Sequence, residues 1–265
     1  MNILIYGTVN SIIFALVAVG FTLVYGVSRL PNFAHGALYV LVGFLTWSLV
    51  NDFKLFYPLA ILISLGISAI LGALIYRLVL IRLRGMATSE IIASFAVGLI
   101  ILEGLRLQGI GGFKGFIGPF YVLPSFIDSK MRISGVLIDT QRLIVILGGL
   151  VVVASIWLFT HYTKTGLSLR AIAQDEQAAM MLGIDSDRAA VISLSIGSAL
   201  AGLAAVIILP LGNVTAEAGY RILINALAVC IIGGLGSWAG AVLASFVLGF
   251  SMIISTSLFG SVWES

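Results

Sequence analysis

A proline, an asparagine, a histidine and a glycine lie together in the segment LPNFAHG at residues 30–36. The flanking stretches 1–28 and 37–50 carry no charged side chain. Pro31 lacks a backbone donor and disfavours helix at the residue before it. Irregular backbone at membrane depth is tolerated only where it is buried in protein or lines a water-filled cavity. This break in a hydrophobic sequence therefore predicts a solute pathway rather than a simple membrane anchor.

Residues at and near the break are candidates for lining that pathway, and each has a structural alternative. Asn32 either binds solute or satisfies backbone groups freed at the break. His35 either gates the path or is a buried, hydrogen-bonded histidine that fixes the break. Tyr25, one turn after Thr22, either faces a pore or packs. A polar residue within the apolar run 222–232 favours a cavity-facing position. The predicted path residues are Tyr25, Asn32, His35, Gly36 and Asn225.

The sequence offers no set of side chains suited to catalysis. It has no Ser/His/Asp grouping, no cluster with metal-ligand spacing and no paired carboxylates within one segment. Lys114 lies in the glycine-rich loop 106–141, but no Ser or Thr follows it, so the phosphate-binding loop pattern is missing. The chain is therefore predicted not to be an enzyme, with no metal site and no cofactor of its own.

Composition points to a membrane protein. Of the 265 residues, 60% are hydrophobic and 9% are charged, against about 25% charged in soluble domains. Long uncharged runs match the roughly 20 residues that cross a bilayer, and three shorter runs are predicted to be half-helices or protein-buried segments. We expect one domain, residues 1–265, an all-α polytopic membrane protein with about eight hydrophobic segments. The long runs are 1–28, 55–76, 143–160, 189–211 and 239–263, and the short runs are 37–50, 91–102 and 222–232.

The charge distribution says little about partners or about orientation in the membrane. The net charge of +3 is small and scattered, which does not suggest a nucleic-acid partner. With segments 77–85 and 163–188 on one side of the membrane, basic residues divide evenly between the sides, so the positive-inside rule does not decide orientation. Glu103 and Arg106 have the i,i+3 spacing of an ion pair. Glu217 and Arg221, four residues apart, either contact a partner protein or form an ion pair within a loop. The single cysteine, Cys230, is predicted to be a buried packing residue.

The segment 163–188 has the composition of a surface helix. Residues 168–182 are strong helix formers, and Gly183 stands where a helix commonly ends. Asp185 or Asp187 is placed to cap the next span. Such a polar helix is either an interfacial helix without a partner or a helix offered to the groove of a cytoplasmic protein.

The two halves of the sequence have a similar order. In each half a long span precedes a break and a short apolar run: the breaks are 31–36 and 212–221. Paired interrupted segments of this kind point to the binding region of a transporter, and a possible internal repeat follows.

Three segments together resemble a known family. They are GFTLVYG at 20–26 leading into NFAHG at 32–36; the segment 165–184, with TG, RA, QAA and LGI; and GSALAGLA at 197–204. The sequence resembles the inner-membrane permease subunits of branched-chain amino acid ABC transporters, specifically the shorter, LivH-like permease. The resemblance extends over most of the chain, although the loop 106–141 matches poorly.

This resemblance implies import of branched-chain or other hydrophobic amino acids, driven by ATP bound on a partner subunit. The implied partners are a second homologous permease, two cytoplasmic ATP-binding subunits and an extracytoplasmic substrate-binding protein. It also implies that segment 165–184 docks on the ATPase and so faces the cytoplasm. The implied docking residues are Thr165, Gly166, Arg170, Gln177, Ala178, Ala179 and Gly183.

Two points of the resemblance leave alternatives open. Family members usually continue into a further hydrophobic segment and a basic tail, whereas this sequence ends at Ser265, so a final span is either truncated or absent. The same family also serves urea and short amides. The alternative function is a passive channel or facilitator for such a small polar solute, and a purely structural membrane subunit is a third reading. A docking helix distinguishes the importer, because a channel has no need of one.

Overall fold

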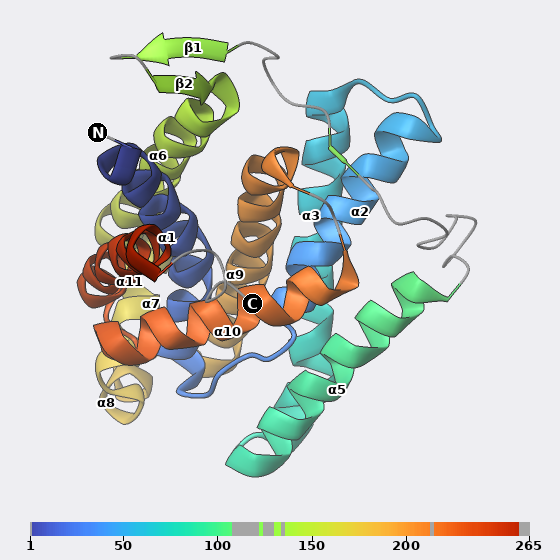
Figure 1. The fold of residues 1–265 in the computed structure, drawn as a ribbon. Helices are drawn as coiled ribbons and strands as arrows, with labels where there is room; N and C mark the ends of the chain where they lie inside the picture. Colours follow the sequence, from blue (N-terminus) through green and yellow to red (C-terminus); the bar gives the residue numbers. More distant parts are fainter. Residues whose placement is uncertain (1, 108–121, 124–129, 134–135, 213–214, 260–265) are drawn as a thin grey trace.

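The computed structural model describes residues 2–107, 122–123, 130–133, 136–212 and 215–259, and most of them are helical (Figure 1). Seven helices within these ranges are long and apolar enough to cross a membrane, and one further apolar helix is shorter. The prediction of an all-α polytopic protein with about eight hydrophobic segments is therefore confirmed.

The first half of the chain contains a long helix, a break and then five further helical elements. A π-helical turn joins α3 to α4, and such turns are frequent at functional sites. The elements are α1 (Asn2–Ser28), α2 (His35–Asn51), α3 (Tyr57–Ile75), the π-helix η1 (Tyr76–Leu80), α4 (Ile81–Leu83) and α5 (Ala87–Arg106).

The second half begins with a two-stranded antiparallel sheet, where the sequence predicted an irregular loop; the rest of residues 108–129 lies outside the described residues, apart from 122–123. Helices follow to the end of the described chain. The elements are β1 (Lys130–Ile133), β2 (Val136–Asp139), α6 (Thr140–Tyr162), α7 (Lys164–Gln174), α8 (Glu176–Met181), α9 (Ser186–Ile208), the 3-10 turn η2 (Leu209–Leu211), α10 (Ala216–Gly233) and α11 (Trp238–Phe259).

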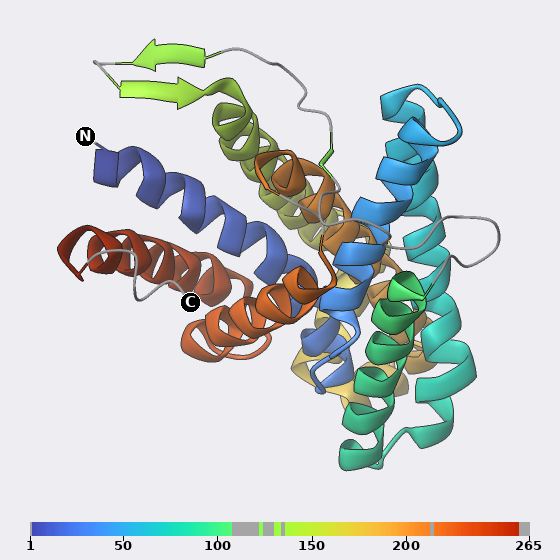
Figure 2. The same cartoon turned by 45° about the vertical axis from the view of Figure 1, so that its right-hand side comes forward.

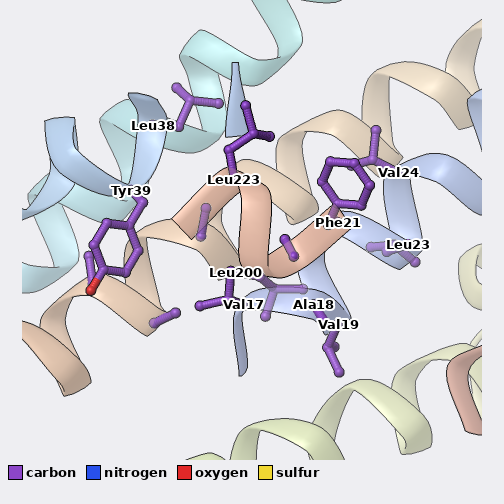
Figure 3. Packing of buried hydrophobic residues seen from close by; sticks show 14 of the residues in the cluster. Val17, Ala18, Val19, Phe21, Leu23, Val24, Leu38, Tyr39, Leu200 and Leu223 are labelled. Atoms are coloured by element: carbon purple, nitrogen blue, oxygen red, sulfur yellow. The ribbon is translucent and has the colours of Figure 1, made fainter. Parts of the chain in front are cut away.

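Helices α1, α2 and α9 form the centre of the bundle. In α1 and α9, 78% and 61% of the most apolar window is buried, against 17–22% in α5, α6 and α11. Figure 3 shows Phe21, Tyr39 and Leu200 among the buried side chains of this core. The outer helices therefore present apolar faces that lipid or other subunits would cover.

Helix lengths differ from the prediction at two of the three short runs. The run 37–50 lies in α2, which is short and largely buried in protein, as predicted. The runs 91–102 and 222–232 lie in α5 and α10, which have 20 and 18 residues. The half-helix prediction was wrong there because each helix continues through the charged residue that bounded the uncharged run, Glu90 in α5 and Arg221 in α10.

The two halves share the order of a long helix, a break and a second helix, and the second helices α2 and α10 touch. A Cβ added at Gly36 would lie 2.0 Å from the carbonyl oxygen of Gly219, and a Cβ at Gly219 would lie 3.0 Å from that of Gly36. This close approach of two backbones requires glycine at position 36 and leaves little room for a side chain at Gly219. The α7 and α8 helices lie at the opposite end of the bundle from the β1–β2 hairpin (Figures 1 and 2).

Candidate translocation and docking sites

The chain between α1 and α2 is held by hydrogen bonds inside the protein. Asn32 is 5% exposed, and its Oδ1 accepts a bond from the Ala34 N–H at 3.1 Å. The Phe33 N–H donates to Ser94 Oγ of α5 at 3.2 Å. The predicted break is confirmed, and backbone groups freed beside Pro31 find protein partners, as burial in a membrane requires. Asn32 thus satisfies a backbone group at the break, which was one of its two predicted roles. Its other predicted role, contact with solute, stays a prediction.

His35 fixes the start of α2 against α1. Its side chain is 1% exposed, and Nε2 lies 3.2 Å from the carbonyl oxygen of Val17. The ring also packs edge-on against Phe21, with centroids 5.6 Å apart. These contacts are those of a buried, hydrogen-bonded histidine. Gly36, the next residue, provides the close crossing with α10 and so also has a packing role.

Asn225 lies apart from the break, at a pocket of about 350 Å³ between α1, α10 and α11. Ser251, Met252 and Ser255 of α11 and Phe14 of α1 also line it. Polar groups on an otherwise apolar wall within membrane-spanning helices are expected to mark a substrate path. Asn225 therefore lines a much larger cavity than Asn32, whose cavity has a volume of about 20 Å³.

Tyr25 lies at the α7–α8 end of α1, half-buried beside Gly236. Its neighbour one turn earlier, Thr22, is fully buried, with Oγ1 2.9 Å from Cys230 Sγ. Cys230 is a buried packing residue, as predicted. The structure thus distributes the five predicted path residues over the break, the end of α1 and the Asn225 pocket.

Residues 163–186, which we call the docking segment, form two short helices instead of the predicted single helix 168–182. Asp175 adopts an extended conformation between α7 and α8, and its Oδ1 accepts a bond from the Ala178 N–H at 3.0 Å. As an N-cap it starts a new helix, which outweighs the helix propensity of its neighbours. Gly183 ends α8 with φ of +84°, and Asp185 caps α9 through the Arg188 N–H, both as predicted.

The predicted docking residues divide between the surface and the interior. Gly166 and Ala179 are buried: a Cβ at Gly166 would lie 2.2 Å from the Phe159 carbonyl oxygen, and Ala179 is 2% exposed. Their side-chain positions therefore serve packing within this chain, so neither faces a partner's groove. Thr165 is half-buried. The exposed members of the set are Arg170, Gln177, Ala178 and Gly183.

The apolar tip of α8 was not among the residues predicted from the sequence. Met181 is 89% exposed and Leu182 is 82% exposed, at the end of the docking segment. Two large apolar residues directly before a helix-ending glycine were the available signal. Adjacent apolar side chains held out from a surface helix are suited to insertion into a groove of another protein.

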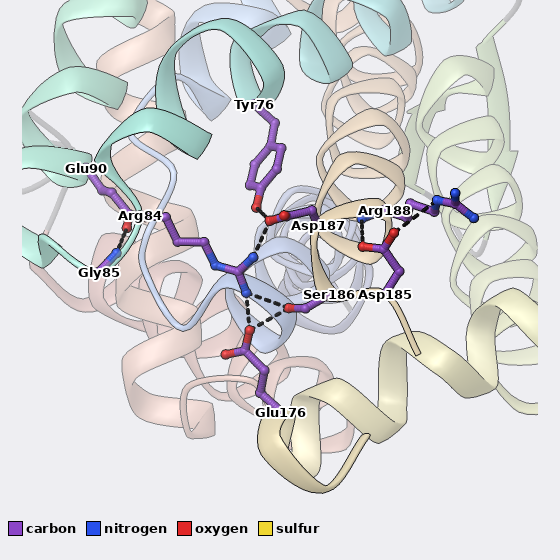
Figure 4. Close-up of polar contacts among 9 residues, drawn as sticks. All are labelled: Tyr76, Arg84, Gly85, Glu90, Glu176, Asp185, Ser186, Asp187 and Arg188. Carbon is purple, nitrogen blue, oxygen red and sulfur yellow. Dashed lines mark hydrogen bonds and ion pairs between the residues drawn. The ribbon is translucent and has the colours of Figure 1, made fainter. Parts of the chain in front are cut away.

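Arg84, in the turn between α4 and α5, contacts the start of α8 and the start of α9 (Figure 4). Its guanidinium forms ion pairs with Glu176 of α8 and Asp187 of α9, and donates to Ser186 Oγ at 2.6 Å. The Tyr76 hydroxyl donates to Asp187 at 2.9 Å. Partial burial opposes the charge of Arg84, but Tyr76 and the two carboxylates raise its pKa above the ordinary value, so it stays protonated.

Arg29 provides a second connection, to the end of α7. It follows α1 with φ of +58°, a conformation that costs a residue with a Cβ about 1–2 kcal/mol. Its guanidinium donates to the carbonyl oxygens of Ala173 and of Gln174, the latter at 3.2 Å. A cation is favourable at these last carbonyls of a helix. The contacts of Arg29 and Arg84 confirm that the segments 77–85 and 163–188 lie at one end of the bundle.

At the other end, an ion pair joins α5 to α10. Arg106 pairs with Glu103 at 3.0 Å, as its spacing predicted, and also with Glu217 of α10 at 2.5 Å. Of the two alternatives for Glu217 and Arg221, the ion pair between them is not formed, because the fold brings Arg106 of another helix to Glu217. Contact with a partner protein stays a prediction.

Comparison with known proteins identifies the family. The profile of the family described as branched-chain amino acid transport system / permease component matches residues 3–265. The chain belongs to this family. It is 26% identical to the high-affinity branched-chain amino acid transport system permease protein BraD of Pseudomonas aeruginosa, over 95% of this chain and 84% of that protein.

Two further relatives carry similar names. The probable branched-chain amino acid transport permease protein LivH of Methanocaldococcus jannaschii is 26% identical, over 96% of this chain and 81% of that protein. The high-affinity branched-chain amino acid transport system permease protein LivH of Salmonella typhimurium is 24% identical, over 95% of this chain and 84% of that protein. No solved structure matches the chain. The protein is thus a LivH-like permease component, a multi-pass protein of the cell (inner) membrane.

Proposed function

We propose that this permease is the membrane-spanning subunit of an ATP-driven importer of branched-chain amino acids. The observation that carries the proposal is the docking segment, which extends from the bundle, exposes an apolar tip and is tied back by Arg29 and Arg84. ATP would be bound and hydrolysed by two separate cytoplasmic subunits, so the chain needs no cofactor. A second homologous permease and an extracytoplasmic substrate-binding protein complete the assembly.

The two arginines give this segment a mechanical role. Arg29 joins α7 to the turn that leads into the helix break, and Arg84 joins α8 and α9 to the turn between α4 and α5. A displacement of α8 by a closing ATPase would therefore reach α1, α3 and α5 through charged contacts. A passive channel has no use for such a braced, exposed segment, which favours the importer over a urea or amide channel.

The translocation path is proposed to follow the Asn225 pocket, at the outer face of α10 and α11. Ile231 and Leu243 are 63% and 69% exposed on these helices. A second permease packed on that face would enclose the pocket and leave Asn225, Ser251 and Ser255 as its polar groups. An aliphatic amino acid requires such a mixed lining, because its side chain is apolar and its backbone groups are charged.

Purification of the tagged chain from its native membrane tests the proposed assembly. We expect an ATP-binding subunit and a second permease of this family to co-purify in constant ratio. The purified chain alone, placed in liposomes, should accumulate no leucine with ATP or a proton gradient. Accumulation by the single chain would contradict the division of labour between subunits.

A further inference from the structure

A charged pocket of about 310 Å³ lies between the docking segment and the helix bundle. The turn after α1, the turn between α4 and α5, and the junction of α8 with α9 enclose it. Ligand pockets range over roughly 300–1,000 Å³, so this volume suits a small metabolite. Arg29, Arg84 and Gly85 on its wall are exposed, so the pocket is open to water at this end of the bundle.

Charges of both signs line the pocket, and two of them have no opposite charge bound to them. Arg84 is neutralised by Glu176 and Asp187. Within the described residues, Arg29 forms no ion pair and bonds only to carbonyl oxygens. Glu90 likewise forms none, and its Oε1 accepts the Gly85 N–H at 3.0 Å (Figure 4). One cation and one anion are therefore available to a ligand.

The remaining wall of the pocket is partly apolar. Val27, Leu30 and Ala190 contribute aliphatic surface beside the charged groups. Ser28, Leu30, Tyr76 and Glu90 also line a narrower cavity of about 20 Å³ that reaches Asn32. A ligand here would thus lie at the solvent-exposed end of the helix break, in contact with the docking segment.

We propose that this pocket binds a free aliphatic α-amino acid as its zwitterion. Its carboxylate would meet the Arg29 guanidinium, its ammonium group would meet the Glu90 carboxylate, and its side chain would lie against Val27 and Leu30. Both contacts are charge-assisted hydrogen bonds, the stronger class. A monovalent anion or cation would leave one of the two protein charges unpaired. The choice of an amino acid as ligand rests on the proposed transport function.

Equilibrium binding to the protein in lipid nanodiscs, with the subunits that co-purify and without the substrate-binding protein, tests the site. The probes are labelled leucine, leucinamide, which lacks the carboxylate, and 4-methylpentanoate, which lacks the ammonium group. We expect leucine to bind about tenfold or more tightly than either analogue, the usual effect of losing one charged hydrogen bond.

The decisive variant is Glu90→Gln, because glutamine keeps an acceptor for the Gly85 N–H and removes only the charge. It should weaken leucine binding about tenfold or more and leave 4-methylpentanoate binding unchanged, since the variant and the analogue remove the same interaction. Arg170→Gln, on α7 outside this pocket, is a control that should retain leucine binding.

Three results would overturn the site. They are no leucine binding by the wild-type protein, equal binding of leucine and its analogues, and equal weakening of leucine and 4-methylpentanoate by Glu90→Gln, which would show a structural effect. ATP-driven leucine uptake by the assembled transporter is measured in parallel. Uptake without this binding rejects the pocket alone, and binding without uptake rejects the transport function alone.

Discussion

The apolar tip of α8 gives the sharpest prediction about docking. Replacing Met181 by Gln and Leu182 by Asn keeps the size of each side chain and removes most of its apolar character. At 89% and 82% exposure these residues contribute little to the fold of this chain. The double variant should therefore insert and fold normally, and its defect should appear only in association with the ATPase.

The size of that defect follows from the exposed area. Burying a whole Leu or Met side chain stabilises by about 1.5–3 kcal/mol, and nearly all of both side chains is available to a partner. Allowing for the aliphatic carbons that Gln and Asn retain, the pair should lose about 2–4 kcal/mol of docking energy. At 1.4 kcal/mol per tenfold, the dissociation constant should rise about 30- to 700-fold.

The assay is equilibrium binding of the purified ATPase subunit to the permease in nanodiscs. Leu107→Asn is the matched control, because Leu107 is 72% exposed at the end of α5, away from the docking segment. Wild-type affinity in the double variant, or an equal loss in the Leu107 control, would refute a docking role for the tip.

Three further predictions concern the contacts within the chain. Arg84→Gln should lower the amount of leucine transported per ATP hydrolysed. Adding Glu176→Gln should lower this amount little further, because both substitutions remove the same Arg84–Glu176 ion pair. Additive losses in a double-mutant cycle would contradict this coupling. Gly36→Ala should destabilise the protein by about 1–3 kcal/mol in thermal unfolding, since the new Cβ meets the backbone of α10. Gly66→Ala is the control, because a Cβ there has nothing within 4 Å. Equal melting temperatures of the two variants would contradict the close crossing of α2 and α10. In a Cys230→Ala background, Asn225→Cys should react with a polar thiol reagent in the assembled transporter; inertness there in every nucleotide state would remove the path from this pocket.

The sequence predicted those features that depend on local residue types. Pro31 and the polar residues around it predicted the break, Gly183 predicted a helix end with positive φ, and Asp185 predicted a cap. Each rests on an intrinsic backbone preference or on a side chain bonding to a near neighbour. Such preferences act over a few residues and are visible without the fold.

Features that depend on distant residues could not be predicted in this way. Asp175 stands within a run of helix formers, and the alternatives of continuing the helix or capping a new one are close in local energy. Arg84 meets Glu176 across 92 residues, and Arg106 reaches Glu217 across 111. The burial of Ala179 and the exposure of Leu182 likewise depend on how α8 packs on α9.

ATP-dependent accumulation of leucine by the reconstituted assembly tests the central claim most directly. Proteoliposomes would contain this permease, its co-purifying permease and ATPase subunits, and the substrate-binding protein on the outer side. The account predicts that leucine inside rises above its outside concentration with ATP, and that no accumulation occurs with a non-hydrolysable analogue or without the binding protein. Equilibration of leucine or urea down its gradient, with no dependence on ATP, would contradict it and identify the protein as a passive channel.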